Sequence, residues 1–170
     1  MSRVDDLIEK FCPDGVEFKL LGDFATLVRG NGLPKSVFTE SGVGCIHYGQ
    51  IYTRYGVWTT ETISHVAPET AAPLAKVDTG DLIITNTSEN IEDVCKSVAW
   101  LGDMQIVTGG HATVIKHDQD PKYLSYYFRT LDSSTRKRNL PPAPRSLTSL
   151  RRAWRRFVFP CRRSKYSAKL

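Results

Sequence analysis

Short runs of β-forming residues, separated by glycine, recur along most of this chain and restrict its possible folds more than any other feature. The runs are rich in valine, isoleucine, leucine and aromatic residues, and most are too brief for a typical helix. They lie at 16–22, 24–30, 43–58, 81–85, 95–102 and 104–110. Runs bounded by glycine are typical of strands joined by turns. We therefore expect a mostly β domain.

Two segments with helical spacing add an α component to this prediction. Apolar residues three and four positions apart predict a short amphipathic helix over 4–11, which the turn sequence at 12–15 ends. A second helix is expected over 121–131, with Pro121 in its first turn. Its apolar face contains Leu124, Tyr127, Phe128 and Leu131. The expected fold class is α+β, mostly β, with one short N-terminal helix and one helix near residues 121–131.

The net charge of +5 divides unevenly along the chain. Residues 136–170 contain 12 Lys and Arg and no Asp or Glu. The preceding residues therefore hold 11 basic and 18 acidic side chains, a net charge of −7. Because this body is acidic, contact with nucleic acid there would depend on local patches, whereas the tail is basic throughout.

Composition and cysteine spacing indicate a cytoplasmic protein. No apolar run approaches the roughly 20 residues of a membrane helix. The first ten residues include three acids where a secretory signal would be positive and then apolar. The four cysteines, Cys12, Cys45, Cys95 and Cys161, are widely scattered, which favours free thiols over a disulfide framework in a reducing compartment.

Several segments imitate catalytic or metal-binding motifs but lack the required spacing. Pro13-Asp14 is too close to Glu17-Phe18-Lys19 for a metal-dependent nuclease motif, and a turn leading into a strand explains the segment better. Asp120-Pro121-Lys122-Tyr123 lacks the second proline of a methyltransferase loop and suits a helix N-cap. The segment 30–35 lacks P-loop spacing, and the histidines do not complete a zinc set with Cys45. We expect no catalytic residue, no cofactor and no bound metal.

The order of longer motifs is more informative than any single one. The chain contains, in sequence, CPDGVEFKLLGD, VRGNGLPKS, CIHYGQIYTRYGV, VDTGDLIIT, TSENIEDVCKSVAWLG and PKYLSYYFRT. This series resembles the first target-recognition domain of the specificity subunits of type I restriction-modification systems. The resemblance covers roughly residues 1–140, a span equal to one ordinary domain.

The resemblance implies a non-catalytic protein that recognises a specific DNA sequence. In the family, two such domains each read half of a split site on double-stranded DNA, and long helices between them bind methyltransferase subunits. Methylation and cleavage belong to the methyltransferase and restriction subunits. Only the first half of the family pattern is recognised here, so we do not expect stable methyltransferase binding without the spacer helices.

Residues 141–170 depart abruptly from the family pattern, which next expects a run like AGTKV and then PLPPLEIQ. In a shifted reading frame from Pro142, each new codon joins the last base of one codon to the first two bases of the next. With a suitable choice of synonymous codons, this frame can be decoded as GTKVTDISAKSLAKIRVPLPPLEIQREI. Deletion of one G from a Leu-Ala-Ala-Gly stretch would leave Leu-Pro-Pro at the junction. We therefore expect residues 141–170 to be a basic tail translated out of frame, with no domain of its own. The alternative is a genuine basic arm, which would also bind nucleic acid.

Polar and aromatic side chains on three segments are the candidates for reading base edges. A loop before the 43–58 run contributes Arg29, Asn31 and Lys35, and a loop after that run contributes Ser88, Glu89 and Asn90. The segment between them contributes Tyr48, Gln50, Tyr52, Arg54 and Tyr55. Arg54 is the best single candidate because a guanidinium can contact guanine through two hydrogen bonds. The alternation of Tyr48, Gln50 and Tyr52 is equally compatible with one face of an ordinary strand.

A second class of function stays open beside DNA recognition. An acidic body suits a protein-binding remnant or scaffold that modulates assembly of the restriction-modification complex no worse than it suits DNA binding.

Overall fold

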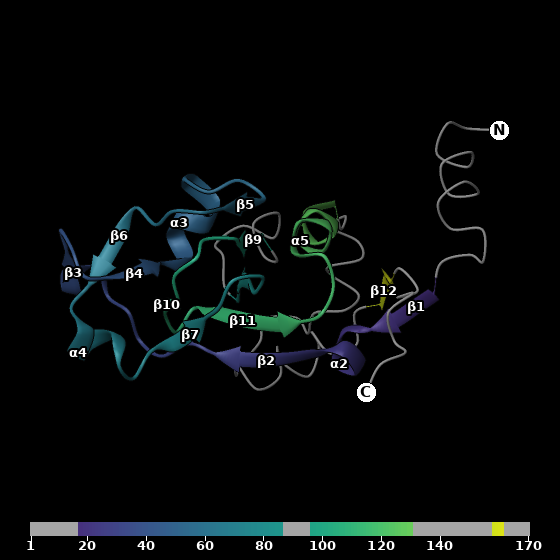
Figure 1. Cartoon of the computed structure of the whole chain (residues 1–170), viewed down its shortest axis with the longest axis horizontal. Coiled ribbons are helices and arrows are strands. Elements are labelled where there is room, and N and C mark those ends of the chain that lie inside the picture. Colours follow the sequence, from purple (N-terminus) through teal and green to yellow (C-terminus); the bar gives the residue numbers. More distant parts are fainter. Residues whose placement is uncertain (1–16, 87–95, 131–157, 162–170) are drawn as a thin grey trace.

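Two five-stranded sheets form the body of the computed structural model, which describes residues 17–86, 96–130 and 158–161. One sheet has the order β3-β6-β4-β10-β7 and the other has the order β2-β11-β8-β9-β5. In Figure 1, β3, β4, β6 and α4 lie at one end of the molecule, and β1 and β12 lie at the other. The mixed, mostly β prediction is confirmed.

The first sheet is built from short strands in the middle of the chain. Its strands are β3 (Phe38–Thr39), β6 (Ser64–Val66), β4 (Val43–Ile46), β10 (Ile106–Thr108) and β7 (Ala75–Val77). The 3-10 helix η1 (Lys35–Val37) leads into β3, and the four-residue helix α4 (Pro68–Ala71) lies between β6 and β7. Only β4 and β10 fall within runs that the sequence predicted as strands.

Three of the six predicted β runs, 24–30, 81–85 and 95–102, form strands of the second sheet. Its strands are β2 (Ala25–Arg29), β11 (Ala112–His117), β8 (Leu82–Thr85), β9 (Ser97–Trp100) and β5 (Trp58–Thr59). Strand β11 pairs antiparallel with both β2 and β8, and the sequence prediction missed it. The short helix α2 (Leu21–Phe24) precedes β2.

The buried apolar residues that the structure describes form three clusters, and each sheet lies between two of them. Leu82 and Ile84 on β8 pack with Leu124 and Phe128 on one side of the second sheet. Ile83, between them in sequence, points to the other side, where it packs with residues of the first sheet. A third cluster, which includes Cys45 and Leu74, lies against α4. The unbroken apolar run of β8 is therefore explained by burial on both faces.

The predicted helix near residues 121–131 is present as α5 (Pro121–Thr130). Leu124 and Phe128 are fully buried and Tyr127 packs beside them, as the spacing predicted. Asp120 accepts a hydrogen bond from the backbone N–H of Tyr123 at 2.7 Å, which is the expected N-cap contact. The expected helix over 4–11 lies outside the described residues, as does Leu131.

The segment 43–58 is not a continuous strand, so the strand prediction for its middle was wrong. Strand β4 ends at Ile46, and α3 (Tyr48–Thr53) follows directly. His47 Nδ1 accepts a hydrogen bond from the N–H of Gly49, and Gln50 Oε1 accepts one from the N–H of His47. This reciprocal cap, together with complete burial of Ile51, stabilises a helix that local propensity does not favour.

A separate antiparallel pair joins the two ends of the described chain. Strand β1 (Glu17–Leu20) pairs with β12 (Val158–Cys161), with Leu20 opposite Val158. The second strand belongs to the segment 141–170, for which the sequence predicted no domain. Four of those residues nevertheless form strand pairing with the body.

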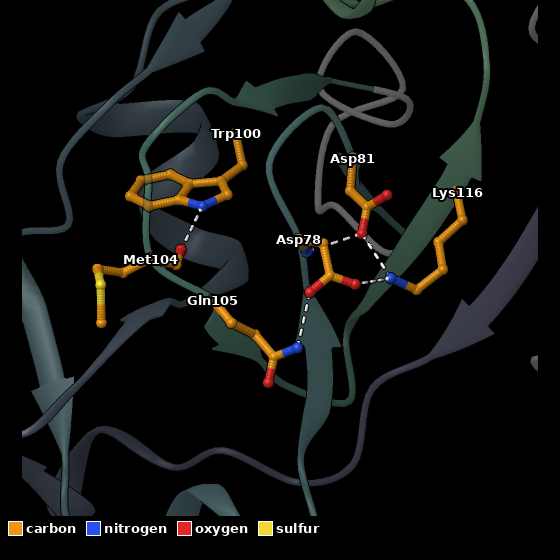
Figure 2. Close-up of polar contacts among 6 residues, drawn as sticks. All are labelled: Asp78, Asp81, Trp100, Met104, Gln105 and Lys116. Atoms are coloured by element: carbon orange, nitrogen blue, oxygen red, sulfur yellow. Dashed lines mark hydrogen bonds and ion pairs between the residues drawn. The ribbon is translucent and has the colours of Figure 1, made fainter.

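A charged network fixes the turn between β7 and β8 (Figure 2). Asp81 N–H donates to the carbonyl of Asp78 at 3.0 Å, which closes a four-residue turn, and Gly80 at its third position has φ of +94°. Lys116 Nζ on β11 lies 2.7 Å from a carboxylate oxygen of each aspartate. Hydrogen bonds from Gln105 and then Lys116 hold the pKa of Asp78 below its usual value. Both carboxylates are thus used to tie the turn to the sheet.

Candidate nucleic-acid interface

Three connections between the two sheets meet at one place, which we call the junction surface. The chain passes from β2 to β3 through residues 30–37, from β4 to β5 through α3, and from β10 to β11 through a turn at 109–111. Asn31 forms an isolated bridge with Gly109, and Gly30 N–H donates to the carbonyl of Ala112 at 3.2 Å. These contacts hold the first and third connections side by side.

Aromatic rings attach the second connection to the same place. The ring of Tyr48, on the first turn of α3, lies 4.4 Å from the ring of His47 and 4.9 Å from that of His111, measured between centroids. Tyr52, one turn later, meets Tyr48 edge to face at 6.2 Å. Phe38 meets His47 at 5.9 Å in the same way. The junction surface therefore has a half-buried aromatic patch with the exposed imidazole of His111 on it.

Two exposed cations lie in the first connection or directly before it. Arg29 is the last residue of β2, opposite Thr113 of β11, and so lies at the same end of the strand pair as His111. Lys35 lies at the start of η1, close enough for its charge to affect His47. No salt bridge occupies either side chain within the described ranges. The acidic body therefore carries two exposed positive charges along this connection, and such charges are what contact with a phosphate backbone requires.

Five of the sequence candidates lie on the three connections or at their ends: Arg29, Asn31, Lys35, Tyr48 and Tyr52. Asn31 is exposed and donates a 2.6 Å hydrogen bond to the carbonyl of Pro73, which fixes its side chain. Because the helix places residues four apart on one face, Tyr48 and Tyr52 stay neighbours even though the expected strand is absent.

Three other candidates are placed differently. Tyr55 is buried in the core, and its hydroxyl accepts a 3.0 Å hydrogen bond from the N–H of Ile63. The amide of Gln50 bonds to His47 and to Ser64, so reading a base would break the helix cap. Arg54 is exposed at the opposite end of α3 from Tyr48, about 9 Å along the helix axis.

The candidates Ser88, Glu89 and Asn90 lie outside the described residues. Asn86, the last described residue before them, nevertheless contacts the third connection of the junction surface. Asn86 donates its backbone N–H to the carbonyl of His111 at 2.9 Å, and its side chain accepts a 2.8 Å hydrogen bond from Thr113.

His47 and His111 are the residues that the sequence prediction missed. Both were considered as metal ligands and set aside because no paired spacing surrounded them. Gly109-Gly110 before His111 indicates a turn, but nothing in the local sequence pairs that turn with α3. Across the ranges that the structure describes, no group of three or more potential metal ligands occurs. Cys45 is buried, and burial raises the pKa of its thiol to about 11, so it is no nucleophile at neutral pH.

The stability of the folded chain is expected to fall as the pH drops below about 6.5. Burial, then the charges of Lys35 and His111, lower the pKa of His47, and burial also lowers the pKa of His117. The unfolded chain therefore binds more protons than the folded one below pH 6.5, so unfolding becomes easier there. Protonation of His47 Nδ1 would also remove the cap on Gly49.

Urea unfolding measured between pH 8 and pH 5 tests this expectation. His47→Asn retains an N-cap acceptor but cannot titrate, so its stability should depend less on pH than that of the unsubstituted chain. An identical pH dependence in the two proteins would show that His47 does not contribute.

No family model and no curated protein matches the sequence. Several solved structures share its fold, among them the following three. The HsdS subunit from Thermoanaerobacter tengcongensis has a TM-score of 0.58 and 15% identity, over 88% of this chain and 34% of that one. A chain from a structure on complex assembly and conformational transition of the type I R-M system has a TM-score of 0.60 and 17% identity, over 92% and 38%. The S subunit of a type I restriction-modification system from M. genitalium has a TM-score of 0.51 and 12% identity, over 88% and 35%.

This chain therefore has the fold of one part of a type I specificity subunit, as the motif order predicted. It spans about a third of the length of the structures that it matches. No helix among the described residues is long and apolar enough to cross a membrane.

Proposed function

We propose that this chain is a DNA target-recognition module of a type I restriction-modification specificity subunit, cytoplasmic and without catalysis of its own. The observation that carries the proposal is the junction surface. It combines an aromatic patch, two exposed cations and the root of a third candidate loop on a fold shared with HsdS subunits. Cations position a protein on phosphates, and side chains at the groove read base edges.

The roles of the cations differ in this proposal. Lys35 binds phosphate as a point charge, whereas Arg29 at the strand end reaches a base edge, with Asn31 beside it. Arg54 has the chemistry for guanine recognition but lies away from the patch, so we propose it as a flanking contact. In an intact type I restriction-modification complex, methyltransferase and restriction subunits would supply the chemistry. One of the matching structures concerns the assembly of such a complex.

Substitutions at the two cations should weaken DNA binding in two distinguishable ways. With duplexes selected by the full chain from a random-core pool, Arg29→Ala should cost about 1–3 kcal/mol and relax the sequence preference. Lys35→Ala should weaken binding to all duplexes alike and reduce the slope of log K against log salt by about 1. Fluorescence anisotropy across a salt series measures both effects.

Lys122→Ala is the matched control, because it removes one exposed positive charge from α5, on a different part of the molecule. An equal loss in the Lys122 variant would mean that net charge, and not the junction surface, controls binding.

Residues 141–170 have a separate place in the proposal. We infer that they are translated out of frame, on the strength of the decoded run that restores PLPPLEIQ. Their cations would then add non-specific attraction to DNA without sequence reading.

A second candidate function, protein binding, is favoured by one observation on another surface. Trp58 on β5 and Tyr123 and Tyr126 on α5 are 46%, 43% and 62% exposed, and Lys122 lies 4.2 Å above the indole ring. Exposed aromatic residues grouped in this way are common in protein interfaces. Co-purification of the chain with a methyltransferase subunit, and its loss in Trp58→Ala, would support this role over DNA recognition alone.

A further inference from the structure

The backbone of His111 is fixed on both sides at the point where the chain passes between the two sheets. Ala112 N–H donates to the carbonyl of Gly109 at 3.0 Å, so His111 is the third residue of a closed four-residue turn. The carbonyl of His111 accepts the 2.9 Å hydrogen bond from Asn86. A side chain at this position projects from a rigid base, which suits precise recognition.

The imidazole ring is also restrained, although it stays exposed. It lies against Tyr48 with a centroid separation of 4.9 Å and an interplanar angle of 46°. Tyr48 is itself held between His47 and Tyr52. Immobilising a side chain on binding costs about 0.5–1.5 kcal/mol, and a ring that is already packed avoids part of that cost.

The surroundings and chemistry of His111 suit a base edge better than a phosphate. An imidazole can take part in hydrogen bonds as donor and as acceptor, as base edges do, whereas phosphate oxygens only accept. Lys35, on η1, already supplies a cation for the phosphate backbone.

We propose that His111 is a specificity-determining residue that contacts a base edge, and that Tyr48 is the residue that positions it. This inference rests on the proposed function, because it names a reading side chain on the same DNA-binding surface. It adds a residue that the sequence motifs did not indicate.

The test compares affinity for a selected duplex with affinity for the unselected random-core pool, using the full chain. The ratio of these two affinities is the sequence preference. His111→Ala should lower the preference about tenfold, near the lower end of the range for a base contact, and leave the salt slope unchanged. Lys35→Ala should instead reduce the salt slope and leave the sequence preference unchanged. The two variants therefore separate base reading from phosphate attraction.

Variants of Tyr48 test the positioning role. Tyr48→Phe retains the ring and should keep the preference, whereas Tyr48→Ala should lower it as much as His111→Ala does. The double variant should lose no more than either single one, because both act on one contact. Thermal melts of each variant identify any that fail to fold. If the Tyr48 variants fail to fold, His111→Ala, at an exposed position, still tests the proposal.

The two proposals can fail separately. If His111→Ala retains the full preference while Arg29→Ala removes it, His111 does not read DNA and the proposed function stands. If the unsubstituted chain binds every duplex alike, or binds none, the proposed function fails, and the inference fails with it.

Discussion

Substitution of Gly30 by alanine should lower the free energy of unfolding by about 3 kcal/mol, the upper end of the range for overpacking a close contact. A Cβ atom at Gly30 would lie 2.0 Å from the carbonyl oxygen of Gly109 and 2.4 Å from its carbonyl carbon. Both atoms belong to the backbone, so no side-chain rotation can relieve the overlap. The two connections joined by the Asn31–Gly109 bridge would have to separate.

Gly32→Ala is the matched control for this prediction. A Cβ atom at Gly32 meets no heavy atom within 4 Å, although the residue lies in the same connection. Its substitution should change the free energy of unfolding by less than about 1 kcal/mol, and toward higher stability, because alanine restricts the unfolded chain. Urea unfolding of both variants, followed by circular dichroism, makes the comparison.

The same pair of variants bears on DNA binding. Separation of the two connections would move Asn31 away from the turn that carries His111, so Gly30→Ala should also lose sequence preference under conditions where it stays folded. Equal stability of the two alanine variants would mean that the backbones do not approach as closely as the structure has them.

Replacement of the 12 Lys and Arg residues in 136–170 by glutamine should remove most of the DNA affinity at low salt. Each phosphate contact contributes about −0.9 to the slope of log K against log salt. With about six such contacts, the unsubstituted chain should lose roughly a thousandfold in affinity between 50 and 200 mM salt. The glutamine variant should show a much shallower slope while retaining its preference for the selected duplex.

A charge-conserving variant provides the control. Replacing the nine arginines of this segment by lysine keeps every positive charge and should keep the slope. Substitution, unlike truncation, also leaves β12 in place to pair with β1. If the glutamine variant binds as tightly and with the same slope as the unsubstituted chain, the body and not the tail is the electrostatic anchor.

Much of the fold could be predicted from local sequence. The runs at 81–85 and 95–102 became β8 and β9 because they are apolar enough to be buried, with turn residues on either side. Helix α5 follows directly from the spacing of Leu124 and Phe128 and the cap at Asp120. Asp78-Thr79-Gly80-Asp81 forms a turn because glycine readily adopts the positive φ that its third position requires.

Other elements depended on contacts between distant segments. The tyrosines after β4 were predicted in a strand because their alternation and aromatic character favour one. Burial of Ile51 and the bond from Gln50 to Ser64 made the segment helical instead. Strand β11 was missed, although it lies between β2 and β8 in its sheet, because a local pattern says little about which segments will pair.

The sequence by itself determined the classes of residue available for recognition: cations and an amide near Gly30, and aromatic rings after β4. Only the tertiary structure decided which of them share a surface. Tyr48 and His111 meet because two connections between the sheets pass within backbone contact at Gly30 and Gly109, and α3 packs beside them. Such meetings are set by strand pairing and close packing across the whole domain, whereas sequence patterns report mainly on neighbours along the chain.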